Sequence, residues 1–272
     1  MSDNTTLSIA VLSGKGGVGK SNLALNISFA LNLKGARVLL IDCDFGLANL
    51  DVLLGITPPK TIQNILDSNL KPADVLVPVN TSAGRSFDLL PASSGVAGSF
   101  DEQRKAPALL TKKISALARR YDYVILDVGA GISPTVLNFA SMALMRVLVI
   151  TPEPTSLTDS YALVKVLSAG RGIRDYLVLV NQIENAKQET QAFKRLSAAC
   201  THFLNISPVF LGGIPDDNNM QEAVRRQTPL LREFPESKSV KHIFAVAEKL
   251  NKLRASMLAR IAALDPLTPV PK

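Results

Sequence analysis

The residues Gly14–Ser21 have the types and the spacing needed to hold a phosphate group. They read Gly-Lys-Gly-Gly-Val-Gly-Lys-Ser and fit the phosphate-binding pattern G-x-x-x-x-G-K-[ST]. Glycines let the backbone turn its N–H groups toward an anion, and a helix that starts at the loop adds its positive end. In this pattern Lys20 reaches the β- and γ-phosphates and the Ser21 hydroxyl ligates Mg²⁺. The candidate nucleotide-binding residues of the loop are Gly14, Lys15, Gly16, Gly17, Val18, Gly19, Lys20, Ser21 and Asn22.

The same glycines allow an alternative, a dinucleotide-binding fingerprint. They also spell G-x-G-x-x-G, and Asp42, at the end of the next apolar run, could bind a ribose. Such a site gives no role to Lys20 and Ser21, and it leaves two further acids, Asp44 and Asp127, unexplained. We therefore favour a mononucleotide site built on a phosphate-binding loop.

Short apolar runs alternate with helical patterns along the chain, as in a parallel sheet covered on both faces. The predicted strands are Leu7–Leu12, Val38–Ile41, Phe87–Leu90, Tyr123–Leu126, Val147–Ile150, Tyr176–Val180 and Val209–Gly213. The predicted helices are Asn22–Leu33, Arg104–Arg120, Pro134–Met145, Ser156–Leu167, Glu189–Ala199, Asn218–Arg226 and Ser239–Ala263. We expect an α/β fold with one doubly wound, mostly parallel sheet and helices on both faces, the P-loop NTPase class. A single domain should cover residues 1–265, and the proline-containing residues 266–272 should form a disordered tail.

Acidic residues follow two of the predicted strands, at the sheet edge where ligands bind in such folds. Asp42 and Asp44 end the second strand. Asp127 follows Val-Ile-Leu and reads as a Walker B acid, which accepts a hydrogen bond from Mg²⁺-bound water or from Ser21. Acids that converge on a phosphate loop in this way indicate a Mg²⁺–nucleotide site.

Lys15 is the unusual residue of the loop, because an ordinary phosphate-binding loop does not require a lysine after its first glycine. The run Lys-Gly-Gly-Val-Gly-Lys-Ser resembles the deviant Walker A signature of the MinD/ParA family of ATPases. In that family the extra lysine reaches the phosphates of the partner in a nucleotide-sandwich dimer. The resemblance therefore implies an ATP-dependent homodimer in which Lys15 supplies a catalytic cation in trans, as an arginine finger does.

The resemblance also implies roles for residues outside the loop. The run from Asp42 to Asp51 is similar to the first switch of the family, in which the second acid, here Asp44, positions or activates the attacking water, while Asp42 supports Mg²⁺ through water. Family positions that frame adenine fall on Asn181 and on Pro215-Asp216. Glu153 falls on a family position at the dimer face near the ribose.

Three runs, over residues 127–133, 151–163 and 223–227, are most similar to the flagellar-number regulators, the FlhG/FleN/YlxH branch of the family. This similarity implies a flagellar regulator, a basal-body protein or a signal-recognition-type GTPase as partner. Many flagellar members carry an activating Asp-Gln-Ala motif in an extension before the first strand. Because only Met1–Thr6 precede that strand here, activation of a GTPase by that route is not expected.

The composition indicates a cytoplasmic, reduced protein. The two cysteines, Cys43 and Cys200, form no C-x-x-C pair, and His202 and His242 have no metal-ligand spacing. We find no signal peptide and no transmembrane helix in the sequence. The formal net charge is +7, and residues 219–272 carry ten Lys or Arg against five Asp or Glu, so the basic excess is C-terminal.

The predicted C-terminal helix, over about residues 239–263, allows two interpretations. Its apolar residues follow helical spacing among several lysines and arginines; they are Leu250, Leu253, Met257, Ile261 and Leu264. The helix could pack on the core, or it could lie on the inner membrane and attach the protein peripherally in its ATP-bound dimer.

The sequence thus predicts a slow Mg²⁺-ATPase that acts as a molecular switch and regulates flagellar number or placement. The alternatives are a MinD ATPase that places the division site, a ParA-like DNA segregation ATPase and a small-molecule kinase or synthetase. DNA is not an expected partner, and we find no acceptor-binding lid that would favour a kinase.

Overall fold

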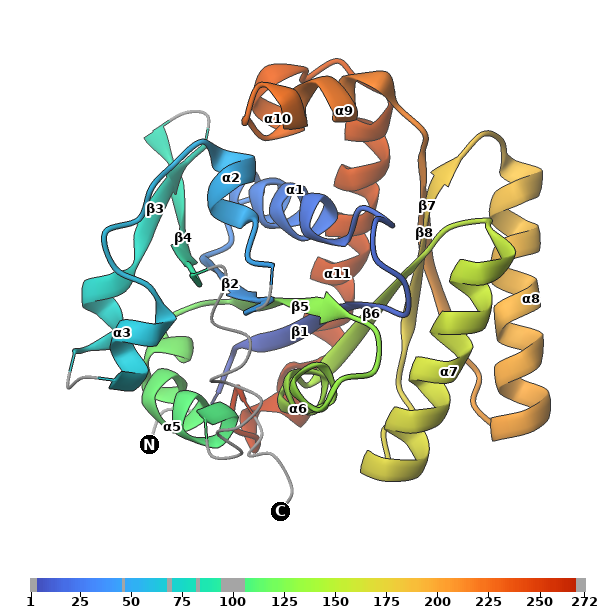
Figure 1. Ribbon diagram of the computed structural model, residues 1–272, viewed down its shortest axis with the longest axis horizontal. Coiled ribbons are helices and arrows are strands. Elements are labelled where there is room, and N and C mark those ends of the chain that lie inside the picture. The colour runs from blue at the N-terminus through green and yellow to red at the C-terminus, as the bar shows by residue number, and fades with distance from the viewer. Residues whose placement is uncertain (1–3, 46, 68–69, 82–83, 94–105, 268–272) are drawn as a thin grey trace.

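A computed structural model of the chain describes residues 4–45, 47–67, 70–81, 84–93 and 106–267. They form an eight-stranded sheet with the order β3-β4-β2-β5-β1-β6-β7-β8, in which every neighbouring pair is parallel except β3 with β4 (Figure 1). The strands are β1 (Leu7–Ser13), β2 (Val38–Cys43), β3 (Val77–Asn80), β4 (Ser86–Leu90), β5 (Tyr123–Ala130), β6 (Met145–Ile150), β7 (Leu177–Ile183) and β8 (Val209–Pro215). This is the predicted doubly wound α/β fold.

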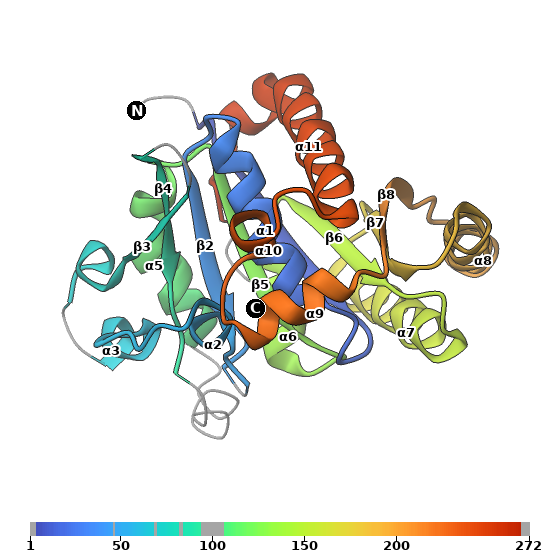
Figure 2. The ribbon, with the colours of Figure 1, turned by 90° about the horizontal axis from the view of Figure 1, so that it is seen from above.

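Helices cover both faces of the sheet, and each face has its own apolar core (Figures 1 and 2). One face is covered by α1 (Lys20–Leu33), α2 (Leu50–Leu54), α9 (Asn218–Arg225), α10 (Leu230–Glu233) and α11 (Lys238–Ala262). The other face is covered by α3 (Ile62–Asp67), η1 (Pro72–Val75), α5 (Ala106–Ala118), α6 (Pro134–Met142), α7 (Pro154–Arg171) and α8 (Ala186–Leu204). The central strands are buried on both faces, which explains why their sequences are continuously apolar.

All seven predicted strands are present, and the described residues also form four short helices and one strand that were not predicted. The missed strand, β3, lies at the sheet edge and contains Pro78, which sequence rules exclude from central strands. The short helices α2, α3, η1 and α10 have too few residues for a periodic apolar pattern. The helix predicted to reach Met145 ends at Met142, because the chain turns there into β6. Residues 104 and 105 of another predicted helix lie outside the described residues.

The C-terminal helix α11 packs on the core, which favours the first of its two interpretations. Leu250 and Ile261 are fully buried, and Leu253 and Met257 pack against the same core, which leaves Leu264 as the exposed member of the stripe. Leu267 is also buried and packs in the core on the other face, which differs from the disorder expected there; residues 268–272 lie outside the described residues. Within the described part of the chain, no helix is both long enough and apolar enough to span a bilayer.

Candidate functional site

The phosphate-loop residues and the acids meet at the carboxyl edge of the central strands β2, β5 and β1. Asp42 of β2 lies directly opposite Asp127 of β5 in the sheet register. Because β1 pairs with β5 on the other side, with Val11 opposite Asp127, the loop that follows Ser13 begins just beyond Asp127. The order of the strands thus brings together segments that are far apart in the sequence.

The loop has its observed path because glycine occupies two sterically demanding positions. A Cβ on Gly14 would lie 2.2 Å from the backbone carbon of Asp159 in α7, so the loop passes against that helix with no room for a side chain. Gly19 has φ +85°, in the left-handed region, and a Cβ there would lie 2.4 Å from Nδ2 of Asn181. The Asn181 amide in turn donates to the Val18 carbonyl oxygen at 2.8 Å. Asn181 therefore holds the phosphate loop in place. The sequence analysis predicted only a contact with adenine for this residue.

Lys20 forms a buried ion pair with Asp127. Its Nζ lies 2.9 Å from Asp127 Oδ1 and 3.5 Å from Ser21 Oγ, and the two paired side chains are 7% and 0% exposed. The second carboxylate oxygen of Asp127 is buried and has no hydrogen-bond partner among the described residues. A polar atom buried in this way is poorly solvated, so the site favours a ligand that supplies a donor or a cation.

Asp42 accepts backbone hydrogen bonds through both of its carboxylate oxygens. Oδ1 accepts from the N–H of Asp44 at 3.0 Å, and Oδ2 accepts from the N–H groups of Asn49 and Leu50, each at 3.3 Å. Burial, followed by the charge of the neighbouring Asp127, raises the pKa of Asp42 to about 8. The carboxyl group thus anchors the first turn of α2, a role that the sequence did not predict.

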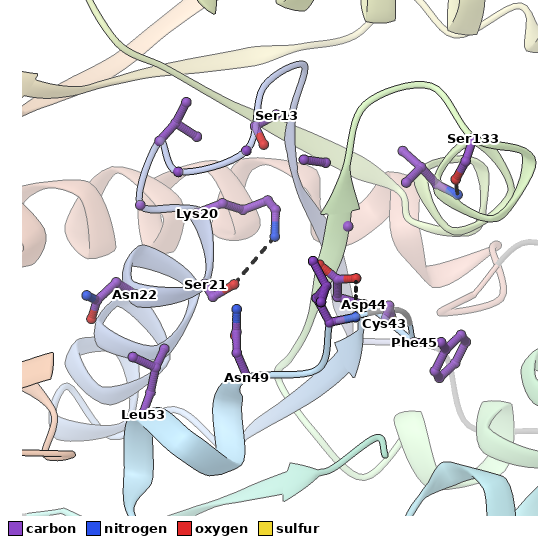
Figure 3. Close-up of a pocket in the computed structure, with 18 of the residues that line it drawn as sticks. Ser13, Lys20, Ser21, Asn22, Cys43, Asp44, Phe45, Asn49, Leu53 and Ser133 are labelled. Carbon is purple, nitrogen blue, oxygen red and sulfur yellow. Dashed lines mark hydrogen bonds between the residues drawn. The ribbon is translucent and has the colours of Figure 1, made fainter. Parts of the chain in front are cut away.

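Asp44 faces the space beside the phosphate loop. Its Oδ1 accepts from the Leu47 N–H at 3.2 Å, and a Cβ on Gly129 would lie 3.2 Å from the same oxygen. Asp44, Lys20 and Ser21 line a common cavity of about 540 Å³ (Figure 3). A glycine at position 129 therefore keeps the β5 loop clear of Asp44.

Lys15 lies outside that cavity. Its Nζ is 2.6 Å from Glu153 Oε2 and 3.0 Å from Thr155 Oγ1, both at the start of α7. The Lys15 and Glu153 side chains are 39% and 59% exposed, so this is a solvated surface pair. The sequence singled out both residues but did not predict their contact.

A second cavity, of about 390 Å³, adjoins the loop on the side of β7 and β8. Asn181, Pro215 and Asp216 line it together with Gly19 and Asn22. These residues were predicted to frame adenine, and the fold does bring them together.

Asp217, at the rim of this cavity, was missed by the sequence analysis. It caps α9 by accepting from the Asn219 N–H at 3.1 Å, and it holds the start of α11 through Ser237 Oγ and the Ser239 N–H. Burial acts to raise the pKa of Asp217, but the hydrogen bonds from Ser237 and Ser239 outweigh it and hold that pKa below its usual value. An aspartate directly before a helical pattern is a capping signal that could have indicated this residue.

The donor set of the larger cavity suits a magnesium–phosphate ligand. Mg²⁺ prefers oxygen ligands and keeps several of its waters, which hydrogen-bond to nearby carboxylates. The hydroxyl of Ser21 and the carboxylate of Asp44 line the cavity and supply such groups, and the unpartnered oxygen of Asp127 is buried behind the lining. Clusters of three His, Cys, Asp or Glu able to hold a metal by themselves are absent from the described residues.

Comparison with known proteins identifies the family. Residues 6–192 of the chain match a protein family described as "AAA domain". The chain is 36% identical over 243 residues to the antiactivator FleN of Pseudomonas aeruginosa, covering 89% of this chain and 85% of that protein. It is 30% identical over 236 residues to the flagellum site-determining protein YlxH of Helicobacter pylori, covering 84% and 76%.

A solved structure agrees with these sequence relatives. The septum site-determining protein MinD of Pyrococcus horikoshii, complexed with Mg-ADP, superposes with a TM-score of 0.75 at 25% identity, over 94% of this chain and 99% of that one. The phosphate loop with its extra lysine, the sheet order and these similarities agree. The chain belongs to the MinD/ParA family of P-loop ATPases and is close to its flagellar members FlhG and FleN.

Proposed function

We propose that this protein is a Mg²⁺-ATP-hydrolysing switch that dimerises on ATP and regulates the number or placement of flagella. The position of Lys15 is the observation on which the proposal depends. The cavity beside the loop is lined by the phosphate-binding Lys20, the Ser21 hydroxyl and the acid Asp44, whereas Lys15 does not line it and pairs with Glu153. A lysine of the loop that does not serve its own cavity is available to a second copy of the chain.

Each residue of the cavity has a task in this proposal. Lys20 leaves Asp127 to bind the β- and γ-phosphates, and Ser21 ligates Mg²⁺, as in other phosphate-binding loops. Asp127 and Asp42 then act on Mg²⁺ through its waters, and Asp44 orients the attacking water. When bound, Mg²⁺ neutralises charge on the phosphates, and Lys15 from the partner adds a cation as negative charge develops.

The second cavity would hold the base. Pro215 and Asp216 would frame adenine, and the free oxygen of the Asn181 amide would accept from the adenine amino group, because its nitrogen already binds Val18. Glu153 would contact the nucleotide of the partner after releasing Lys15.

Exposed apolar side chains support a dimer face near the nucleotide. Leu47 is 75% exposed and Val224 38%, and both line the larger cavity. Ile132, in the loop after β5, is 52% exposed. Large exposed apolar groups around a charged cavity are typical of a surface that a partner covers.

The flagellar role follows from the similarity to FleN and YlxH, and a flagellar regulator, a basal-body protein or a signal-recognition-type GTPase is the proposed partner. Placement of the division site is the second candidate, on the similarity to MinD. We place the protein in the cytoplasm. Peripheral membrane contact through the C-terminal segment would have to use Leu258 of α11 and Leu264, just after it, since the rest of the predicted stripe is buried or packs on the core.

The test is the Asp44→Ala variant in light scattering with Mg²⁺-ATP. Removal of the water-positioning acid should slow hydrolysis and leave the phosphate cradle intact, so the variant should accumulate as an ATP-bound dimer. Asp51→Ala, an acid of the same segment that does not line the cavity, is the matched control and should behave as wild type. If Asp44→Ala binds ATP and remains a monomer, the sandwich dimer is wrong.

A further inference from the structure

A further cavity, of about 370 Å³, lies at the edge of the sheet opposite the phosphate loop, and it is lined by none of the residues that line the two cavities beside that loop. The parallel strands β4, β2 and β5 are neighbours in the sheet and begin at this edge. An arginine that lines the cavity stands within three residues before each of them: Arg85, Arg37 and Arg120. The fold thus gathers three guanidinium groups around a space of the size of small-molecule sites, roughly 300–1,000 Å³.

The acids at this edge of the sheet already have partners. Asp122 accepts two hydrogen bonds from the Arg37 guanidinium, from Nε at 3.1 Å and from Nη2 at 3.0 Å. Asp88 accepts from the Tyr121 hydroxyl at 2.6 Å. Burial, followed by this bond, raises the pKa of Tyr121, so the hydroxyl keeps its proton and remains the donor.

The other two guanidinium groups have no such partner. The side chains of Arg85 and Arg120 form no hydrogen bond or ion pair with any described residue. Arg85 lies over the turn between α1 and β2, since a Cβ on Gly35 would be 3.4 Å from its Nη1. Guanidinium groups that share a cavity repel one another, and an anion between them would remove that repulsion.

The donors around the cavity suit a phosphate group. A guanidinium group is planar and presents pairs of N–H donors that match two oxygens of one phosphate. A phosphate ester has three strongly accepting oxygens, enough to bind more than one guanidinium at a time. The cavity has room for more than the phosphate itself, and Ala36, Val38 and Phe87 give it an apolar wall.

We propose that this cavity binds a small phosphorylated molecule, whose phosphate lies between the guanidinium groups of Arg85 and Arg120. Arg37 adds a third contact through Nη1, because only its Nε and Nη2 are used on Asp122. The site is separate from the proposed nucleotide site, so its ligand is not a second substrate of the proposed ATPase.

The experiment is calorimetry with phenyl phosphate on the full chain in saturating Mg²⁺-ADP, which keeps the probe out of the phosphate loop. Phenol, which has no phosphate, is the comparison probe. Arg85→Ala and Arg120→Ala are compared with Arg260→Ala, which removes an exposed arginine of α11 outside the cavity. Circular dichroism verifies that each variant is folded, as expected for substitutions of exposed side chains.

Wild type should bind phenyl phosphate and not phenol, and inorganic phosphate should displace the bound probe. Loss of a charged hydrogen-bonding partner should weaken binding about tenfold or more in Arg85→Ala and in Arg120→Ala. Arg85→Lys keeps the charge but not the paired donors, and its affinity should fall between those of wild type and Arg85→Ala. Arg260→Ala should bind as wild type does.

Three results would overturn the inference. The first is a folded wild-type protein that binds no phenyl phosphate at millimolar concentration. The second is an equal loss of affinity in Arg260→Ala, which would indicate general attraction of anions to a basic protein. The third is binding of phenol as tight as that of phenyl phosphate, because the phosphate would then not be recognised. The proposed function fails separately, if Mg²⁺-ADP itself does not bind.

Discussion

Replacing Lys20 by methionine should destabilise the nucleotide-free protein as well as weaken nucleotide binding. Lys20 and Asp127 are 7% and 0% exposed and their charged atoms lie 2.9 Å apart. With an effective dielectric constant of about 20, their attraction is about 6 kcal/mol, and it offsets the loss of solvation of both ions. Lys20→Met keeps the length of the side chain and leaves the Asp127 carboxylate buried without its cation. Removal of one partner of a buried pair costs about 3–5 kcal/mol.

Urea unfolding followed by far-UV circular dichroism measures this loss, since the chain has no tryptophan for fluorescence. With a urea dependence of about 3 kcal/mol/M, the unfolding midpoint should fall by about 1–1.7 M. The double variant Lys20→Met/Asp127→Asn removes both charges and should regain most of the stability, although it should bind nucleotide no better. A Lys20→Met protein as stable as wild type, or a double variant less stable than the single one, would contradict the buried pair.

Four further predictions follow from the site and from α11. Lys15→Ala should keep ADP affinity and lose dimerisation and turnover, and an equal loss of ADP affinity in calorimetry would show that Lys15 acts within its own chain. Gly14→Ala should lower both the melting temperature and the affinity for nucleotide, because its Cβ would lie 2.2 Å from the α7 backbone. Burial and a neighbouring carboxylate raise the pKa of Asp42 to about 8, so the folded protein holds a proton that the unfolded chain releases near pH 4. Without Mg²⁺ and nucleotide, stability should therefore fall as pH rises from 6 to 8, by at most about 1.4 kcal/mol per pH unit, and urea titrations of Asp42→Asn should show a smaller slope. Ile261→Glu buries a charge and should unfold the protein in circular dichroism, whereas Leu264→Glu, at an exposed position, should not.

Much of the site was predictable because its signals are local. The loop Gly14–Ser21 is a continuous segment whose glycines and lysine have fixed tasks, and the acids Asp42, Asp44 and Asp127 stand directly after apolar strands. In a parallel sheet the carboxyl ends of strands share one edge, so the pattern alone brings these groups together. Their roles with nucleotide remain predictions, because they depend on a ligand.

Contacts between distant residues were not predictable. Glu153 holds Lys15 although 138 residues separate them, and Asn181 holds the Val18 carbonyl across 163 residues. Asp42 caps α2 in place of Asn49, because the end of β2 happens to lie beneath the first turn of that helix. Sequence patterns show how residue types alternate along the chain. They do not show which distant groups come within hydrogen-bond distance in the folded protein.

The sequence by itself determined the α/β class, seven of the strands, the phosphate loop and the family. Tertiary structure alone decided that Lys15 lies outside its own cavity, that three arginines gather at the opposite edge of the sheet and that the apolar stripe of α11 packs on the core. There is a physical reason why the sequence determined the first set of features and not the second. Strand, loop and helix signals arise from backbone geometry over a few residues, whereas an amphipathic helix has the same pattern on a core or on a membrane, and only the surface opposite it decides which one it covers.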